Sequence, residues 1–279
     1  MSRIQDILAK ADRDGTARRL QPTPAPMTSA SVLTPAFETP LGTSPFVAAT
    51  LPAPTTAAPA ARAEPRTARA TLHPSLVAAI APHSDVAEQY RSIRAKITTR
   101  EEMGPLRTIG ITSPAARDGK SVTAANLALT MAQEFQRQVV LVDADLRHPS
   151  VHSLFAIERG PGLTEVLKGE ATLDDALVYL PEFQLSLLPA GTGAEYPTEL
   201  LGSAAMRRTL DALGGRFDRM LLDLPAALPL ADVGTVAPYT DGLLMVVRAG
   251  VTQRPALDQA LAIFEEQKVL GVVLNAKSV

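Results

Sequence analysis

Short and almost uninterrupted apolar runs alternate with amphipathic stretches over most of the chain, and few folds accommodate such a pattern. The apolar runs predict strands and the amphipathic stretches predict helices. Strands are expected at Arg107–Thr112, Gln138–Asp143, Gln184–Pro189, Arg219–Asp223, Gly242–Val247 and Leu270–Leu274. Helices are expected at Ser121–Phe135, Ser203–Leu213 and Pro255–Gln267, with another starting after the N-cap Ser84. The sequence therefore predicts an α/β fold with a mostly parallel sheet covered by helices on both faces.

The composition changes sharply near residue 70. Residues 15–70 are rich in proline, alanine and threonine and show no helical or strand period. Such a segment buries too little apolar surface to offset its ordering entropy, so it is predicted to be a disordered linker. Within residues 1–14, Ile4, Ile7 and Leu8 fall at helical spacing, which predicts a short amphipathic helix; a frayed terminus is the alternative. Residues 71–279 are expected to form one folded domain.

Charge and cysteine content exclude several classes of protein. The formal net charge is −2, so no strong electrostatic attraction to nucleic acid is expected. The chain has no cysteine, which excludes disulfides and thiolate-held metal sites and fits a reducing compartment. No apolar stretch approaches the roughly 20 residues that span a bilayer, so we expect a soluble, cytoplasmic protein.

A phosphate-binding loop is predicted directly after the first expected strand. The segment Ser113-Pro-Ala-Ala-Arg-Asp-Gly-Lys-Ser-Val leads into a helix and resembles a Walker A loop, with Pro114 in place of its first glycine. Backbone N–H groups at a helix start attract phosphate, a lysine adds a cation for the β- and γ-phosphates, and a serine hydroxyl can ligate Mg²⁺. ATP and Mg²⁺ are therefore the predicted cofactors. The residues expected to contact the nucleotide are Ala116, Arg117, Asp118, Gly119, Lys120, Ser121 and Val122.

Three aspartates follow predicted strands. Asp143 and Asp145 end one apolar run two residues apart, and Asp223 ends another. Side chains two residues apart in an extended segment point the same way, and ligands of parallel sheets bind at the carboxyl ends of the strands. We expect all three carboxylates to face one metal and phosphate site, although a cap or turn role is the alternative for any single one.

Several segments resemble the bacterial tyrosine kinases of capsule and exopolysaccharide synthesis, which are related to septum-site and partition ATPases. The resemblance covers about residues 85–275. The matching segments are Glu88-Gln-Tyr-Arg-Ser-Ile-Arg, Gly119-Lys-Ser, Val142-Asp-Ala-Asp-Leu-Arg-His-Pro, Pro197-Thr-Glu-Leu-Leu, Asp223-Leu-Pro and Gly271-Val-Val-Leu-Asn. Asp143-Ala-Asp-Leu-Arg-His-Pro is the most specific of them.

This resemblance implies roles for individual residues. It implies that Lys120, Asp143 and Asp145 are catalytic, with Asp143 as the base toward a tyrosine hydroxyl or as a metal partner. It implies that Ser121, Asp145 and Asp223 hold Mg²⁺ directly or through water. Asn275 is then either a contact of adenine or a turn residue.

The resemblance also implies assembly of several copies into a ring. In that family a Glu-x-x-Arg-x-x-Arg helix joins neighbouring subunits, and the matching residues here are Glu88, Arg91 and Arg94. Their spacing alone also fits a solvated pair within one helix, and that alternative stays open.

The sequence departs from the family pattern at the loop and at its end. Ala116-Arg117 replaces the usual Pro-Gly; if that glycine position needs a positive φ, Arg117 costs roughly 1–2 kcal/mol or bends the loop. Leu224 and Ala226 replace a hydroxyl residue and a second proline. The family's terminal tyrosine cluster has no counterpart, so little or no tyrosine self-phosphorylation is expected unless an internal tyrosine suffices. The chain's four tyrosines are Tyr90, Tyr179, Tyr196 and Tyr239.

The resemblance therefore implies a kinase-like, ATP-binding regulator of exopolysaccharide or capsule synthesis and export. Its partner is expected to be a membrane-spanning protein of polysaccharide chain-length control or export, which recruits it to the inner face of the membrane. The alternative is a non-kinase ATPase switch of the partition or septum-site type. A partition ATPase that binds DNA is less consistent with the sequence, because Ala115 stands where those proteins usually have a signature lysine.

Overall fold

A computed structural model describes residues 66–67, 72–102, 104–134, 137–228, 232–264 and 268–275. The helix expected within residues 1–14 lies outside these residues, as does nearly all of the predicted linker. The descriptions below concern the described residues.

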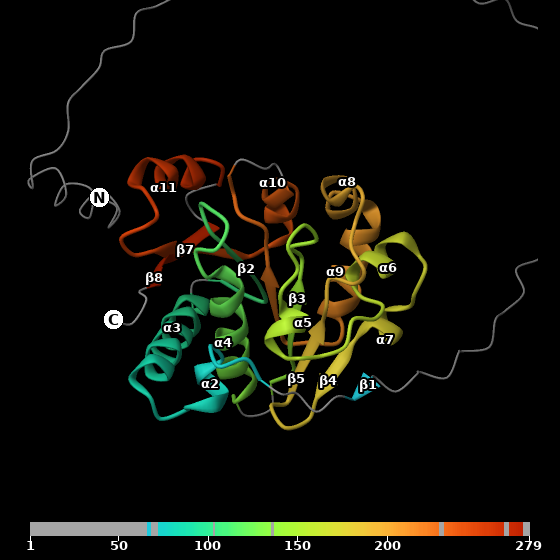
Figure 1. Cartoon of the computed structure of the whole chain (residues 1–279), viewed down its shortest axis with the longest axis horizontal. Coiled ribbons are helices and arrows are strands. Elements are labelled where there is room, and N and C mark those ends of the chain that lie inside the picture. Colours follow the sequence, from blue (N-terminus) through green and yellow to red (C-terminus); the bar gives the residue numbers. More distant parts are fainter. Residues whose placement is uncertain are drawn as a thin grey trace, which may run out of the picture. The chain divides into compact units, whose positions relative to one another are not determined.

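One sheet of eight strands forms the centre of the fold, in the order β1-β4-β5-β3-β6-β2-β7-β8 (Figure 1). Neighbouring strands are parallel except β4 and β5, which are antiparallel. The strands are β1 (Arg66–Thr67), β2 (Thr108–Thr112), β3 (Val139–Asp143), β4 (Val178–Leu180), β5 (Leu185–Leu188), β6 (Arg219–Asp223), β7 (Gly242–Arg248) and β8 (Val269–Asn275).

Helices connect the strands and cover both faces of the sheet. They are α2 (Val77–Ile80), α3 (Asp85–Glu101), α4 (Lys120–Ala132), α5 (Val151–Leu154), α6 (Leu163–Lys168), α7 (Leu173–Ala176), α8 (Pro197–Leu201), α9 (Ala204–Gly214), α10 (Asp232–Val236), the 3₁₀ helix η1 (Ala237–Tyr239) and α11 (Arg254–Leu261). Helices α2, α3 and α4 lie side by side (Figure 1). No helix among the described residues is both long and apolar enough to cross a membrane.

The alternation of side chains along the strands divides the core into two clusters. In β7, Leu243, Met245 and Val247 pack with α6, α8, α9 and α11, whereas Leu244 and Val246 pack on the opposite face with α2, α3 and α4. Strands buried on both faces need apolar residues at successive positions, which is why they read as continuous apolar runs in the sequence.

The predicted fold class is confirmed, and each of the six predicted strands has its counterpart in the sheet. Helix α3 begins at the predicted cap: the Ser84 hydroxyl accepts a hydrogen bond from Ala87 N at 3.2 Å. Two strands were not predicted. The antiparallel β4 has only three residues, and β1 lies within the predicted linker and pairs with β4.

The strand order places the predicted motifs at one edge. β6 lies between β3 and β2, and the pairing register sets Asp143 opposite Asp223 and Ile111 opposite Asp223. The loop after β2, the aspartates after β3 and the aspartate ending β6 therefore meet at the carboxyl end of the sheet, where ligands of such folds bind.

Candidate active site

The loop between β2 and α4 is held by side chains from distant parts of the chain. The buried carboxylate of Asp118 accepts hydrogen bonds from Ala115 N at 3.0 Å and from the Thr252 hydroxyl at 2.9 Å. Asn275 Nδ2, at the end of β8, donates to the carbonyl of Asp118 at 2.9 Å. Gly119 has φ +99°, and a Cβ built there would lie 2.1 Å from Asn275 Nδ2, so the close approach of Asn275 requires glycine.

A run of backbone N–H groups in this loop is free to bind a ligand. Among the described residues, no hydrogen bond uses the N–H groups of residues 116–122, and the next one, Thr123 N, donates to Gly119 O at 2.9 Å. The run enters the first turn of α4, whose dipole favours negative charge. Successive free N–H groups at a helix start form an anion-binding cradle, so the predicted nucleotide contacts lie together.

Lys120 lies among the carboxylates. Its Nζ is 2.7 Å from Asp145 Oδ2, 3.4 Å from Asp223 Oδ1 and 3.1 Å from the Ser121 hydroxyl. The side chains of Lys120 and Asp145 are almost completely buried, and that of Asp223 is fully buried. The structure thus brings together the lysine of the loop and the predicted metal ligands.

Carboxyl groups outnumber cations in this cluster. Burial and the neighbouring Asp223 raise the pKa of Asp143 to about 8, and burial also raises the pKa of Asp223 despite the attraction of Lys120. Burial alone would lower the pKa of Lys120, but Asp223 and Asp145 outweigh burial and raise it. One ammonium group therefore faces three carboxyl groups, an arrangement that favours binding of a further cation.

The residues present fit a hydrated Mg²⁺ ion. Asp223 Oδ2 is buried and forms no hydrogen bond with any described residue. Carboxylate and hydroxyl oxygens suit Mg²⁺, which keeps several waters and is usually held by one or two carboxylates together with phosphates. No cluster of three or more acidic, histidine or cysteine residues among the described residues could hold a metal by itself. Any ion here would thus depend on Ser121, water and the phosphates of a bound nucleotide as well.

Asp143 is fully buried, and backbone N–H groups occupy both of its carboxylate oxygens. Its Oδ1 accepts from Asp145 N at 3.2 Å, and its Oδ2 accepts from Ser150 N and Val151 N at 3.0 Å each. These bonds fix the turn after β3 and the start of α5. Asp143 therefore orders the segment that carries Asp145.

Arg147, two residues after Asp145, belongs to a network that joins three elements. Its guanidinium pairs with Asp232, the first residue of α10, and lies 3.2 Å from the hydroxyl of Thr198 in α8. Thr198 also donates to Asp232, which is fully buried. The network thus joins the Asp-Leu-Arg and Pro-Thr-Glu-Leu-Leu segments through direct side-chain contacts.

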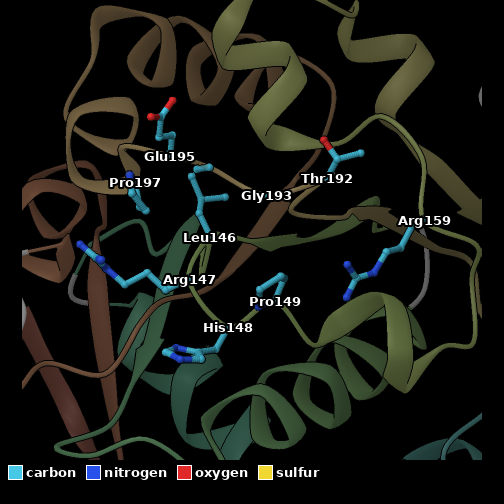
Figure 2. A pocket seen from close by; sticks show the side chains of 11 residues that line it. Leu146, Arg147, His148, Pro149, Arg159, Thr192, Gly193, Glu195 and Pro197 are labelled. Carbon is cyan, nitrogen blue, oxygen red and sulfur yellow. The ribbon is translucent and has the colours of Figure 1, made fainter.

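An open pocket of about 560 Å³ is lined in part by the segment that follows Asp145. It begins at Leu146, next to Asp145, and Figure 2 shows His148 and Pro149 on one rim and Thr192 and Glu195 on another. The lining residues are Leu146, Arg147, His148, Pro149, Arg159, Gly191, Thr192, Gly193, Ala194, Glu195 and Pro197.

Glu165, at the start of α6, fixes one wall of this pocket. Its carboxylate accepts from Thr192 N at 3.0 Å, from the Thr192 hydroxyl and from Gly162 N at 2.8 Å. Burial alone would raise the pKa of Glu165, but the bonds from Thr192 and Gly162 outweigh burial and lower it. Glu165 therefore stays ionised and holds the Gly191–Thr192 turn in place.

The predicted assembly residues lie on α3 and contact groups of their own chain. Arg91 pairs with Glu88 at 2.7 Å and donates to the Pro82 carbonyl at 2.7 Å. Arg94 donates to the carbonyl of Thr130 in α4 at 2.6 Å and lies 3.5 Å from Glu134. The pair within one helix, the alternative left open by the sequence, is therefore present in the single chain.

Sequence reasoning overlooked several residues at this edge. It assigned no role to Asp232, Thr198, Glu165 or Thr252. The Pro-Thr-Glu-Leu-Leu segment was one available signal for Thr198. For the other three, the partner is distant in sequence and no local pattern marks it.

Relatives with assigned activities share most of this chain. The tyrosine-protein kinase YwqD of Bacillus subtilis is 34% identical over 205 residues, which make up 73% of this chain and 86% of YwqD. The tyrosine-protein kinase Ptk of Acinetobacter johnsonii is 33% identical over 202 residues, but the match covers only 27% of that longer protein. No protein-family model matches the chain.

Solved structures agree with these relatives. The kinase domain of the Escherichia coli tyrosine kinase ETK superposes with a TM-score of 0.68 at 25% identity, covering 72% of this chain and 79% of that domain. These similarities confirm the resemblance seen in the sequence. The chain belongs to the family of bacterial tyrosine-protein kinases.

Proposed function

We propose that the chain binds ATP with Mg²⁺ at the loop of residues 116–122 and transfers the γ-phosphoryl group to protein tyrosine hydroxyls. The observation that carries this proposal is the run of free N–H groups beside a buried lysine and carboxylates. Phosphoryl transfer depends mainly on positioning and on electrostatic stabilisation, and these residues supply both.

Each residue of the site has a role in this proposal. The N–H groups of residues 116–122 bind the phosphates, and Lys120 moves from the carboxylates to the β- and γ-phosphates. Ser121, Asp145 and Asp223 would hold Mg²⁺ directly or through water. When bound, Mg²⁺ would offset the charge that develops on the phosphate oxygens during transfer. The adenine base would lie near Asn275, which already contacts the loop.

The contacts of Asp143 and Asp145 support different roles for the two aspartates. Backbone N–H groups occupy both oxygens of Asp143, which supports a positioning role in addition to the base role expected from the family. Asp145 Oδ2 contacts Lys120 at 2.7 Å and becomes free when that lysine moves to phosphate. A free carboxylate beside the pocket can bind the metal or accept the proton of a tyrosine.

Labelled ATP distinguishes a kinase from an ATPase switch. The purified chain is incubated with γ-labelled ATP, Mg²⁺ and a copolymer of glutamate and tyrosine, with Lys120→Met as the inactive control. A kinase transfers label to tyrosine of the copolymer, whereas a switch of the septum-site or partition type releases only free phosphate. Release of phosphate without phosphotyrosine would replace the kinase proposal by the alternative.

We propose that this activity regulates exopolysaccharide or capsule synthesis and export beside a membrane-spanning partner at the inner face of the membrane. Support comes from relatives such as the succinoglycan biosynthesis transport protein ExoP of Rhizobium meliloti, 34% identical over 201 residues. The chain spans about a quarter of such longer relatives. Pull-down of a candidate partner with ATP and with ADP tests the proposal; equal recovery in both would argue against a nucleotide-dependent interaction.

We propose that copies of the chain assemble through Glu88, Arg91 and Arg94. The Glu88 side chain is 69% exposed, so its pair with Arg91 can be exchanged for a pair with a second copy at little cost. Light scattering with ATP and Mg²⁺ should show an oligomer for the wild type and a smaller species for Arg91→Ala with Arg94→Ala. Lys96→Ala, also exposed on α3, is the matched control. A wild-type monomer would contradict assembly.

A further inference from the structure

We infer that Tyr196 is the tyrosine on which one copy of the chain phosphorylates another. This inference rests on the proposed kinase function and names an acceptor for it within the chain itself.

Exposure separates Tyr196 from the other tyrosines. All four tyrosines of the chain lie among the described residues, and Tyr196 is 61% exposed. Tyr90 packs half-buried against α4, where burial raises its pKa. Tyr179 is half-buried in β4, and Tyr239 packs against the core. An acceptor hydroxyl must reach the γ-phosphate of another molecule, and Tyr196 meets that requirement without unfolding of its surroundings.

The position of Tyr196 favours transfer between two copies. Its neighbours Glu195 and Pro197 line the pocket beside Asp145, whereas Tyr196 itself does not (Figure 2). Tyr196 therefore lies at the rim of this pocket without lining it, and its side chain is exposed. A second copy that meets this rim receives the tyrosine, and the first copy's pocket remains free.

Two anchors hold the segment that presents Tyr196. On one side, Glu165 binds the backbone and hydroxyl of Thr192. On the other side, Thr198 donates to the buried Asp232, and the carbonyl of Tyr196 accepts from Leu200 N at 3.1 Å. A fixed segment loses less conformational entropy when it docks than a flexible one does, so presentation at this rim favours productive encounters.

The charges of the segment and of the pocket complement each other. Residues 193–199 carry two acidic side chains, Glu195 and Glu199, and no basic one. In the pocket, Arg159 has no acidic partner among the described residues; its Nε contacts His152 at 3.2 Å. Arg159 of one copy can thus attract the acidic segment of another. The volume of the pocket, about 560 Å³, lies within the usual range of binding pockets.

The chemical step transfers one phosphoryl group. The phenolic oxygen of Tyr196 forms a bond to the γ-phosphorus of ATP bound to the other copy, and the bond from that phosphorus to the β–γ bridging oxygen breaks. ADP leaves with the electron pair of that bond, and the phenolic proton passes to the aspartate that acts as base in that copy and from there to solvent. The product carries close to two negative charges at Tyr196.

The experiment compares labelling of the chain with labelling of an external acceptor. Wild type, Tyr196→Phe and the matched control Tyr239→Phe are each incubated with ATP and Mg²⁺. Phosphotyrosine on the chain is mapped by mass spectrometry, and transfer to the glutamate–tyrosine copolymer is measured in parallel. We expect Tyr196→Phe to lose at least tenfold of the self-labelling and to keep copolymer labelling within twofold of wild type. Tyr239→Phe should match the wild type in both.

A mixing experiment tests transfer between copies. Lys120→Met, which retains Tyr196, is mixed with Tyr196→Phe, which retains the active site, and label should appear on the Lys120→Met chain. Self-labelling that persists in Tyr196→Phe, or a wild type that labels the copolymer but not itself, would overturn the Tyr196 assignment and leave the kinase function intact. A wild type that labels neither acceptor would overturn both proposals.

Discussion

Strand β6 carries a buried charged side chain at each end, and the surroundings of the two differ. At its start, Arg219 is 2% exposed, pairs with Glu101 of α3 and donates to the carbonyl of Leu106. At its end, Asp223 shares one ammonium group, that of Lys120, with Asp145, and Asp143 lies opposite on β3. At the first end Glu101 has a buried cation, Arg219, and a more exposed one, Arg137, at 3.8 Å, whereas the second end has three carboxyl groups and one cation. A paired buried charge maintains the fold; an unpaired excess marks a site that a ligand completes.

The largest effect is expected at the nucleotide end. Lys120→Met should lower the affinity for ATP with Mg²⁺ by more than about 100-fold, because loss of a charged partner in a desolvated contact costs roughly 3–5 kcal/mol. Calorimetric titration measures this affinity. Lys96→Met makes the same substitution at an exposed position of α3 and should bind ATP as the wild type does. Undiminished binding by Lys120→Met would refute the site.

The opposite end should respond in stability and not in binding. Arg219→Met should lower the free energy of unfolding by about 3 kcal/mol, because the pair loses its buried cation and Glu101 keeps only the more distant Arg137. Urea denaturation gives this value, while ATP affinity should stay unchanged. Arg137→Met is the matched control: Arg137 also approaches Glu101, at 3.8 Å, but its side chain is 37% exposed, so a loss below about 1 kcal/mol is expected. A similar loss of stability in both variants would show that burial of the arginine does not determine how much its ion pair contributes.

Asp223→Asn should sharpen the contrast between the two ends of β6. Removing one of three buried carboxyl groups relieves the cost of ionising them side by side, so the free energy of unfolding without ligand should rise by roughly 1 kcal/mol, as is common where function opposes stability. The same change should weaken the Mg²⁺ dependence of ATP binding. Thermal unfolding without nucleotide and titrations with and without Mg²⁺ measure the two effects. A less stable variant would mean that Lys120 already offsets the repulsion among the three carboxyl groups.

The smallest effect concerns the backbone of the loop. Arg117 has φ +68°, so the strain expected from its replacement of glycine is present. Arg117→Gly should raise the free energy of unfolding by about 0.5–1 kcal/mol, because relief of the left-handed strain exceeds the extra flexibility of glycine in the unfolded chain. Arg117→Ala keeps the positive φ and removes the charge. An equal gain in that control would trace the effect to charge instead of strain.

The sequence could predict what depends on local pattern. Strands β2, β3 and β6 are buried on both faces and therefore appear as apolar runs, and the residues that follow them give the loop and the three aspartates. Because parallel strands end at one edge of the sheet, the sequence alone could predict that the loop and the aspartates lie together, without knowledge of side-chain contacts.

The sequence could not predict features set by distant contacts. The bond from Thr252 to Asp118 joins residues 134 positions apart, and that from Arg147 to Asp232 joins residues 85 positions apart. No spacing rule links such residues. β4 escaped prediction because three residues provide too short a pattern, and its pairing with β5 is antiparallel. The partners of Arg94 on α4 were hidden for the same reason, since backbone carbonyls leave no mark in a sequence.

The contact between Asn275 and the Asp118 carbonyl joins residues 157 positions apart and has a consequence for how the protein folds. The loop is synthesised before most of the chain, yet β2, which carries it, lies between β6 and β7, and β8 must pair before Asn275 reaches the loop. Contacts of such large sequence separation form late, because closing long loops is entropically slow. Nucleotide therefore cannot guide the early stages of folding, and it stabilises only molecules in which the last strand is already in place.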